Sequence, residues 1–119
     1  MSATVWICKH QALRRNTGLT PMDFSPAEAY GKIRFITKGD MPGNSLGHMR
    51  PVWAREVLEF VTEYNPLTDF IVATGQPSSI FAIGHALGIA GKTPRFLVWS
   101  HEDNHYHILD GVAMEAEHV

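Results

Sequence analysis

One segment of the chain has the residue types of an anion-binding turn. It contains Thr74, Gly75, Gln76, Ser78 and Ser79, and it stands between an apolar run and a helical pattern. A helix start presents unpaired amide hydrogens and a positive dipole end, which favour phosphate or carboxylate. The glycine allows a close approach to the backbone, and the serines offer hydroxyl donors. The alternative is an ordinary turn in which a serine caps the helix, because neither GxGxxG nor a Walker lysine pattern is present.

A second segment, residues 101–107, carries three histidines and two carboxylates in seven positions. His105 and His107 alternate by two, so on a strand both imidazoles project from one face, as two ligands of a transition metal require. His101 or Asp103, across a predicted turn, can supply a third ligand. The alternative is a solvated turn whose histidines lie on its wet side or form a pH-sensitive surface.

Three polar regions are predicted to contact a partner protein: the basic stretch near the N-terminus, the loop 39–47 and the tip of the hairpin that carries the histidines. The alternatives for the basic stretch are a phosphate, a short stretch of nucleic acid, or no partner at all, as in a solvated loop. The candidate partner-binding residues are Arg14, Arg15, Asn44 and His48. A net charge of -2 argues against binding to an extended nucleic acid.

Cys8 and the tryptophans are predicted to pack rather than react. His10 lies on the same side of an extended strand as Cys8 and is the base that a nucleophilic thiol would need, but free cysteines are usually buried. Trp6, Trp53 and Trp99 fall in predicted core elements. A single cysteine excludes an internal disulfide and a Cys-rich zinc site.

The elements that must position these residues follow from hydrophobic periodicity. Strands are predicted over 4–9, 32–38, 69–74, 96–99 and 106–109, and helices over 51–64 and 78–88. The stretch 10–21 has neither period and is predicted to be irregular. Ser25, followed by Pro26 and Glu28, predicts the cap of one short helical turn. Helix 78–88 is apolar nearly all round and is predicted to be buried, with Gly84 and Gly88 against the sheet.

This order predicts an α/β fold: a small single domain with a mixed sheet, mainly parallel β-α-β-α-β crossovers closed by a C-terminal antiparallel hairpin. The domain spans residues 1–119, with an N-terminal strand and basic connection over 1–22 and a polar tail over 111–119. With 45% hydrophobic residues, a chain of this size buries roughly two-thirds of its unfolded surface. No apolar run approaches the roughly 18 residues of a membrane span, so no membrane partner is expected. Edge strands allow a homo-oligomer.

Three segments in order resemble a group of short accessory proteins of tailed bacteriophages. They read DFSPAEAYGKIRFITKGD, PLTDFIVATGQPSSIFAIGHAL and RFLVWSHEDNHYHIL, between residues 23 and 109. The resemblance implies a phage accessory product in the cytoplasm of the bacterial host. It implies no activity and no catalytic residue.

Three functions are consistent with these features. The first is a non-enzymatic accessory protein that binds a host component, as an inhibitor or adaptor in host takeover or anti-defence, and requires no cofactor. The second is a binder of a nucleotide-like anionic small molecule at the turn 75–79, with Arg34, Arg50 or Lys92 pairing with its phosphates. The third is a small enzyme that uses His101, His105 and His107, with or without a transition metal.

Overall fold

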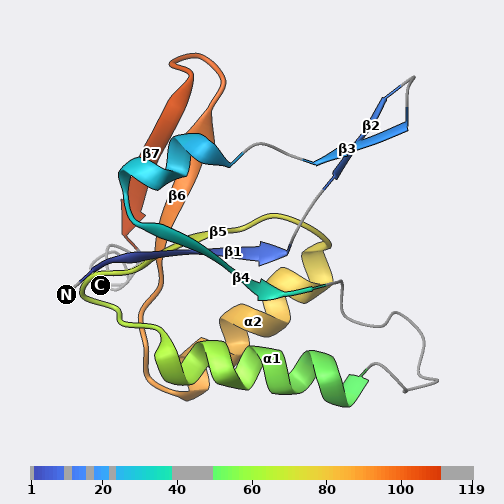
Figure 1. Cartoon of the computed structure of the whole chain (residues 1–119). Coiled ribbons are helices and arrows are strands. Elements are labelled where there is room, and N and C mark those ends of the chain that lie inside the picture. The colour runs from blue at the N-terminus through green and yellow to red at the C-terminus, as the bar shows by residue number, and fades with distance from the viewer. Residues whose placement is uncertain (1, 10–11, 16–17, 22–23, 39–49, 111–119) are drawn as a thin grey trace, which may run out of the picture.

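A five-stranded mixed sheet forms the centre of the molecule (Figure 1). The structure is a computed structural model that describes residues 2–9, 12–15, 18–21, 24–38 and 50–110. Its strand order is β4-β1-β5-β6-β7; the first four are parallel and β7 is antiparallel to β6. The strands are β1 (Thr4–Lys9), β4 (Lys32–Thr37), β5 (Phe70–Val72), β6 (Arg95–Ser100) and β7 (His105–Asp110). The predicted α/β class, with parallel crossovers and a C-terminal hairpin, is confirmed.

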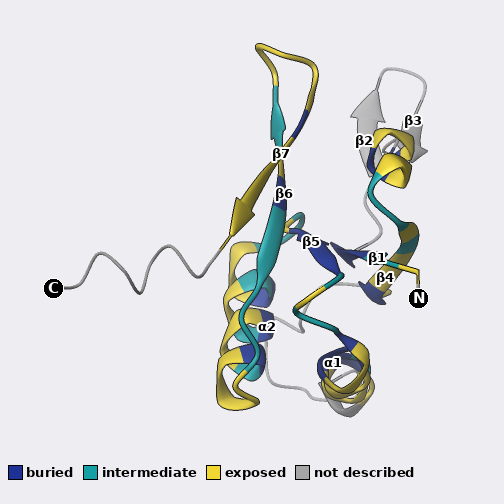
Figure 2. Cartoon of the chain, turned by 90° about the vertical axis from the view of Figure 1, so that its left-hand side faces the viewer, coloured by how far each residue is buried: buried dark blue, intermediate teal, exposed yellow. Residues whose placement is uncertain are grey.

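The two faces of the sheet are covered unequally (Figures 1 and 2). Helices α1 (Arg50–Glu63) and α2 (Pro77–Ile89) pack on one face. The 3-10 helix η1 (Ser25–Ala29), in the connection from β1 to β4, packs on the other. In the part of the chain that the structure describes, no helix combines the length and apolar character needed to cross a membrane.

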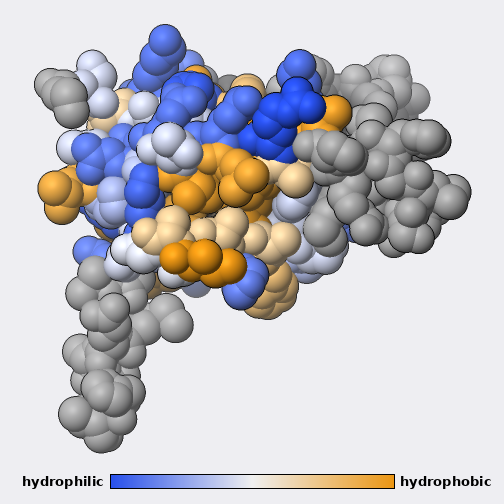
Figure 3. All heavy atoms as spheres, turned by 90° about the horizontal axis from the view of Figure 1, so that it is seen from below, coloured by the Kyte–Doolittle hydropathy of each residue, from blue (hydrophilic) through white to orange (hydrophobic). Residues whose placement is uncertain are grey.

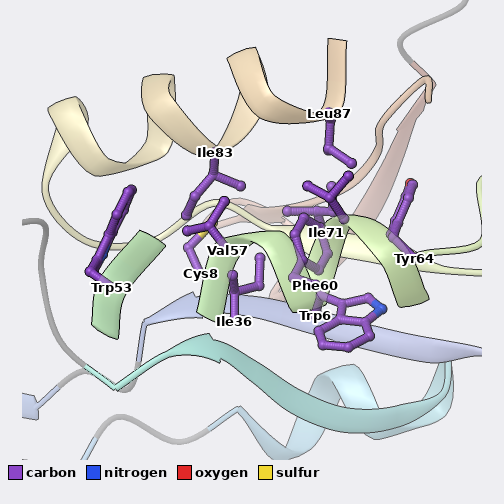
Figure 4. Close-up of a cluster of buried hydrophobic side chains, with 11 residues drawn as sticks. Trp6, Cys8, Ile36, Trp53, Val57, Phe60, Tyr64, Ile71, Ile83 and Leu87 are labelled. Atoms are coloured by element: carbon purple, nitrogen blue, oxygen red, sulfur yellow. The ribbon is translucent and has the colours of Figure 1, made fainter. Parts of the chain in front are cut away.

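Side chains of β1 point alternately to the two faces of the sheet and contribute to a hydrophobic core on each face. Trp6 and Cys8 point toward the helices, whereas Val5 and Ile7 point toward η1. On the helix side, the ring of Phe60 meets Trp6 edge-on at 5.0 Å between centroids (Figure 4). The buried residues of this cluster are Trp6, Cys8, Ile36, Trp53, Val57, Phe60, Val61, Tyr64, Ile71, Ile83 and Leu87. The prediction that Trp6 and Trp53 are packing residues is therefore confirmed.

The stretch 10–21 was predicted to be irregular, and that prediction is wrong. It contains β2 (Ala12–Arg15) and β3 (Gly18–Pro21), which form a separate antiparallel ribbon. Among the described strands, these two pair only with each other. A ribbon that does not join the main sheet is not required to alternate polar and apolar residues, so its sequence carried no strand period.

Helix α2 was predicted to be buried all round, with its glycines against the sheet, and this is also wrong. Ser79, Ile83 and Leu87 face the core, whereas Phe81 is 80% and Ile89 is 75% exposed. Gly84 and Gly88 are exposed, with open space where a side chain would stand. Exposed hydrophobic residues accordingly gather on the underside of the molecule, which Figure 3 shows from below. Figure 2 shows the reason: α2 forms the outer layer, and no further described element covers it.

The predicted helix starts lie slightly off the observed ones. The 3-10 helix is capped at Phe24 instead of Ser25, and α2 is capped at Gln76 with Pro77 in its first turn. Neither predicted serine therefore occupies the cap position.

Candidate functional site

The carboxyl ends of the parallel strands meet at the edge of the sheet where α/β proteins bind ligands. From β1 the chain passes to β4 on one side of it and later returns to β5 on the other side. The direction of strand order therefore reverses between β1 and β5. The connection that leaves β5 at this edge contains Thr74 and Gly75, because β5 ends at Val72 and not at the predicted Thr74.

A cavity of about 690 Å³ opens beside this edge, on the face of the sheet that carries η1. Phe24 and Pro26 of the 3-10 helix segment form one wall, and the strand β6 with Tyr106 of β7 forms another. The end of β5 and the residues after it form the third. The lining consists of Phe24, Pro26, Val72, Ala73, Thr74, Phe96, Leu97, Val98, Trp99, His101 and Tyr106. It is mostly apolar, with Thr74 and His101 as polar members.

The register of the hairpin explains the aromatic wall. In the antiparallel pair, Trp99 lies opposite Tyr106 and Leu97 opposite Ile108, so these side chains share the face that carries η1. The rings of Trp99 and Tyr106 meet edge-on at 5.0 Å between centroids. The Tyr30 hydroxyl, just after η1, donates a hydrogen bond of 3.2 Å to the Tyr106 carbonyl oxygen. This bond ties the η1 segment to β7.

The residues of the predicted anion-binding turn lie in different surroundings in the structure. Thr74 lines the cavity, whereas Gln76 is the N-cap residue immediately before α2. The buried Ser79 hydroxyl donates to Gln76 Oε1 at 3.1 Å, and Ser78 is exposed. Gly75 has a φ of 109°, in the region that favours glycine. The Ser79 hydroxyl, one of the predicted donors to an anion, is thus already bonded to Gln76. Gly75 is required by the backbone conformation of the turn, whether or not a ligand binds there.

The cations suggested for phosphate pairing lie elsewhere. Arg34 bonds Glu63 and stacks over the Trp6 ring at 4.4 Å, on the helix side of the sheet. Lys92 Nζ donates to the carbonyl oxygens that end α1, including that of Tyr64 at 2.9 Å. The side chain of Arg50 is outside the described residues. In the part of the cavity lining that the structure describes, no residue is lysine or arginine.

The three histidines fall in two places. His105 and His107 group with Asp103, with one ligand atom from each residue and all of these atoms within 4.8 Å of one another. His101, the alternative third ligand, lines the cavity and is not a member of that group.

The predicted partner-binding residues can be located only in part. Arg14 and Arg15 lie on β2, opposite Leu19 and Gly18 of β3. Their side chains lie outside the described residues, as do Asn44, His48, the rest of the loop 39–47, and His10.

Cys8 is a packed thiol. Its side chain is 2% exposed within the helix-side core. Burial raises the pKa of the Cys8 thiol to about 11, although a backbone hydrogen bond from Thr74 opposes the shift. A thiol with this pKa is protonated at neutral pH, so the packing interpretation is favoured over the nucleophile.

The aromatic cavity was missed at the level of sequence. Trp99 was assigned to packing, and the contributions of Phe24, Pro26 and Tyr106 were not foreseen, because these residues are far apart along the chain. The available signal was the alternation of β6, which puts Leu97 and Trp99 on one face.

Fold and site together define a small α/β domain with an apolar cavity at the carboxyl edge of its sheet. The chain matches the family of Phage Pam3 gp32-like proteins over residues 3–110, and it belongs to that family. The resemblance to phage proteins is confirmed, and the match includes β1 as well as the segments after residue 23. Neither a curated protein nor a solved structure matches the chain.

Proposed function

We propose that this phage protein acts without catalysis, by binding a host molecule that inserts a flat, mostly apolar group into the cavity beside η1. The observation that carries the proposal is the cavity itself, about 690 Å³ in volume and lined by the rings of Phe24, Trp99 and Tyr106. Binding in the host cytoplasm would then inhibit or redirect the host molecule, as host takeover or anti-defence requires.

Size and lining both support a ligand of this kind. Ligand cavities commonly measure about 300–1,000 Å³ and combine apolar walls with a few polar groups that fix orientation. Here Thr74 and His101 are the polar groups, and the edge-to-face pair of Trp99 and Tyr106 offers ring surfaces for stacking. The aromatic side chain of a host protein fits these walls.

A nucleotide-like ligand is the second candidate. It is favoured by Thr74, which belongs both to the cavity lining and to the turn that precedes α2. The base would occupy the cavity, and the phosphate would meet amide hydrogens at the helix start. Because none of the described lining residues is lysine or arginine, an uncharged group fits better than a phosphate.

The test is capture from host lysate followed by native mass spectrometry, with three forms of the protein. Ala73→Phe places a ring in the cavity lining, and Ala54→Phe places the same ring on the exposed side of α1. A host protein retained by the wild type and Ala54→Phe but lost with Ala73→Phe supports the proposal. A small adduct that absorbs at 260 nm, with the same variant pattern, supports the nucleotide candidate instead. Equal retention by all three forms, or no retained molecule, overturns both.

A further inference from the structure

We propose that Asp103, His105 and His107 bind one divalent transition-metal ion at the tip of the β6–β7 hairpin. Each of the three offers one ligand atom, and these atoms lie within 4.8 Å of one another. All three residues are exposed, so an ion can reach them without a change in either core. The site is separate from the cavity, and the proposal does not rest on the proposed function.

The hairpin itself brings the ligands together. His105 and His107 lie opposite Ser100 and Val98, so they share one face of β7. Their rings are tilted relative to each other, with centroids 4.6 Å apart and an interplanar angle of 33°. Asn104, with a φ of 54°, donates its backbone N–H to the Ser100 carbonyl oxygen at 2.8 Å and closes the turn. This turn folds Asp103 back toward the two imidazoles.

The hydrogen bond of His105 shows which of its ring nitrogens can bind an ion. Its Nδ1 lies 3.1 Å from the backbone oxygen of Asp103. A carbonyl oxygen only accepts, so in the neutral imidazole Nδ1 carries the hydrogen and Nε2 has the lone pair. Histidines that bind metals commonly donate their other ring nitrogen to a carbonyl or carboxylate in this way, which fixes tautomer and orientation.

The ligand atoms of His107 and Asp103 are already almost as far apart as two ligands of one bound ion. His107 Nε2 and Asp103 Oδ2 are 2.9 Å apart. Ligands bound tetrahedrally at zinc bond lengths are separated by about 3.3 Å. An ion would therefore displace to solvent the proton shared by these two atoms, and the His105 ring would move to complete the set of ligands. Two imidazole nitrogens and one carboxylate oxygen suit Zn²⁺, Ni²⁺ or Cu²⁺ and leave at least one coordination position open.

The chain provides matched controls. His101 lines the cavity, and His85 is exposed on α2; neither belongs to the cluster. If binding reflected only the general affinity of surface histidines for metal, His85→Ala and His101→Ala would weaken it as much as His107→Ala.

The experiment is calorimetric titration of the tag-free, full-length protein with Zn²⁺, repeated with Co²⁺ while its visible absorption is recorded. We expect one ion per chain and a Co²⁺ spectrum that reports nitrogen and oxygen ligands. His107→Ala and Asp103→Asn should each weaken binding by at least about 10-fold, and His105→Ala with His107→Ala should abolish it. His85→Ala, His101→Ala and Ala73→Phe should leave the affinity unchanged. Circular dichroism of each variant should match that of the wild type.

A wild-type protein that binds no Zn²⁺ overturns the proposal. Unchanged affinity in the double variant overturns it as well, since the ion would then lie on other residues. Because Ala73→Phe tests the cavity and the histidine variants test the hairpin, the two proposals can fail independently.

Discussion

The two ends of the parallel strands are built differently. At the amino end, before β5, Asp69 is 4% exposed and its carboxylate accepts four hydrogen bonds. The donors are the backbone N–H groups of Thr4 and Asn65, the indole of Trp6 and the Thr68 hydroxyl. At the carboxyl end, the space beside β5 and β6 is instead an apolar cavity.

Two cations also make contacts at the amino end. Lys92 donates hydrogen bonds to carbonyl oxygens at the end of α1. Arg95 donates to the Leu67 carbonyl oxygen at 3.1 Å, and its guanidinium lies over the Phe70 ring at 4.3 Å. Both belong to the amino end of the sheet. The described residues that line the cavity include no lysine or arginine. The amino end therefore concentrates polar contacts that stabilise the fold, whereas the carboxyl end is lined mainly by apolar side chains.

The largest effect is expected at Asp69. Asp69→Ala leaves four donors without their acceptor, and a buried unsatisfied donor is costly, so the free energy of unfolding should fall by about 3 kcal/mol or more. Urea denaturation measures this loss. Glu59→Ala, at an exposed position on α1, should change stability by less than about 0.5 kcal/mol. If the two ends of the parallel strands contributed equally to stability, Ala73→Phe would lower the free energy of unfolding as much as Asp69→Ala. The comparison predicts that Ala73→Phe affects binding and that Asp69→Ala affects stability.

The next effect is a pH dependence from Cys8, which lies near the carboxyl end of β1. Its pKa is raised from an ordinary value near 9.0 to about 11 in the folded protein. The unfolded chain therefore loses this proton first, and stability should fall as the pH rises from about 9 to 11. Since one pKa unit corresponds to about 1.4 kcal/mol, the loss should reach about 2–3 kcal/mol.

Denaturation curves at several alkaline pH values test this dependence, with Cys8→Ala as the comparison. The raised pKa of Tyr64, caused mainly by its burial, adds a loss of the same sign to both proteins. The difference between the two slopes therefore isolates Cys8. Parallel slopes would contradict the prediction.

The smallest effect concerns two glycines in different backbone environments, Gly75 in the turn before α2 and Gly84 within α2. Gly75→Ala forces a side chain onto a backbone with φ 109° and should cost about 1–2 kcal/mol. Gly84→Ala fills open space on a helix and should stabilise the protein by about 0.5–1 kcal/mol. Thermal unfolding of both variants measures the difference. Equal changes would show that the turn before α2 is not strained.

Much of the architecture was readable from local patterns. The alternation in β1 and β4 and the helical spacing of α1 predicted these elements nearly to their observed ends. Burial of all three β5 residues agrees with an unbroken apolar run. Alternating strands and helices then predicted parallel crossovers, because short connections of one hand leave few alternatives.

The site was less predictable, because it depends on which strands become neighbours. The turn after β5 was found from its residue types, but its Ser79 is used within the turn and its Thr74 meets a cavity. The histidine segment was found from its spacing, yet only its register showed that Asp103 joins the pair and His101 does not.

By itself, the sequence determined what each segment could form, since periodicity and turn chemistry act over a few neighbouring residues. It determined the class of fold and a hairpin that presents two histidines on one face. The tertiary structure alone decided the strand order, the exposure of α2 and the cavity between η1 and the hairpin. These features depend on contacts between residues far apart in the chain, and a local pattern carries no information about which distant surface will cover it.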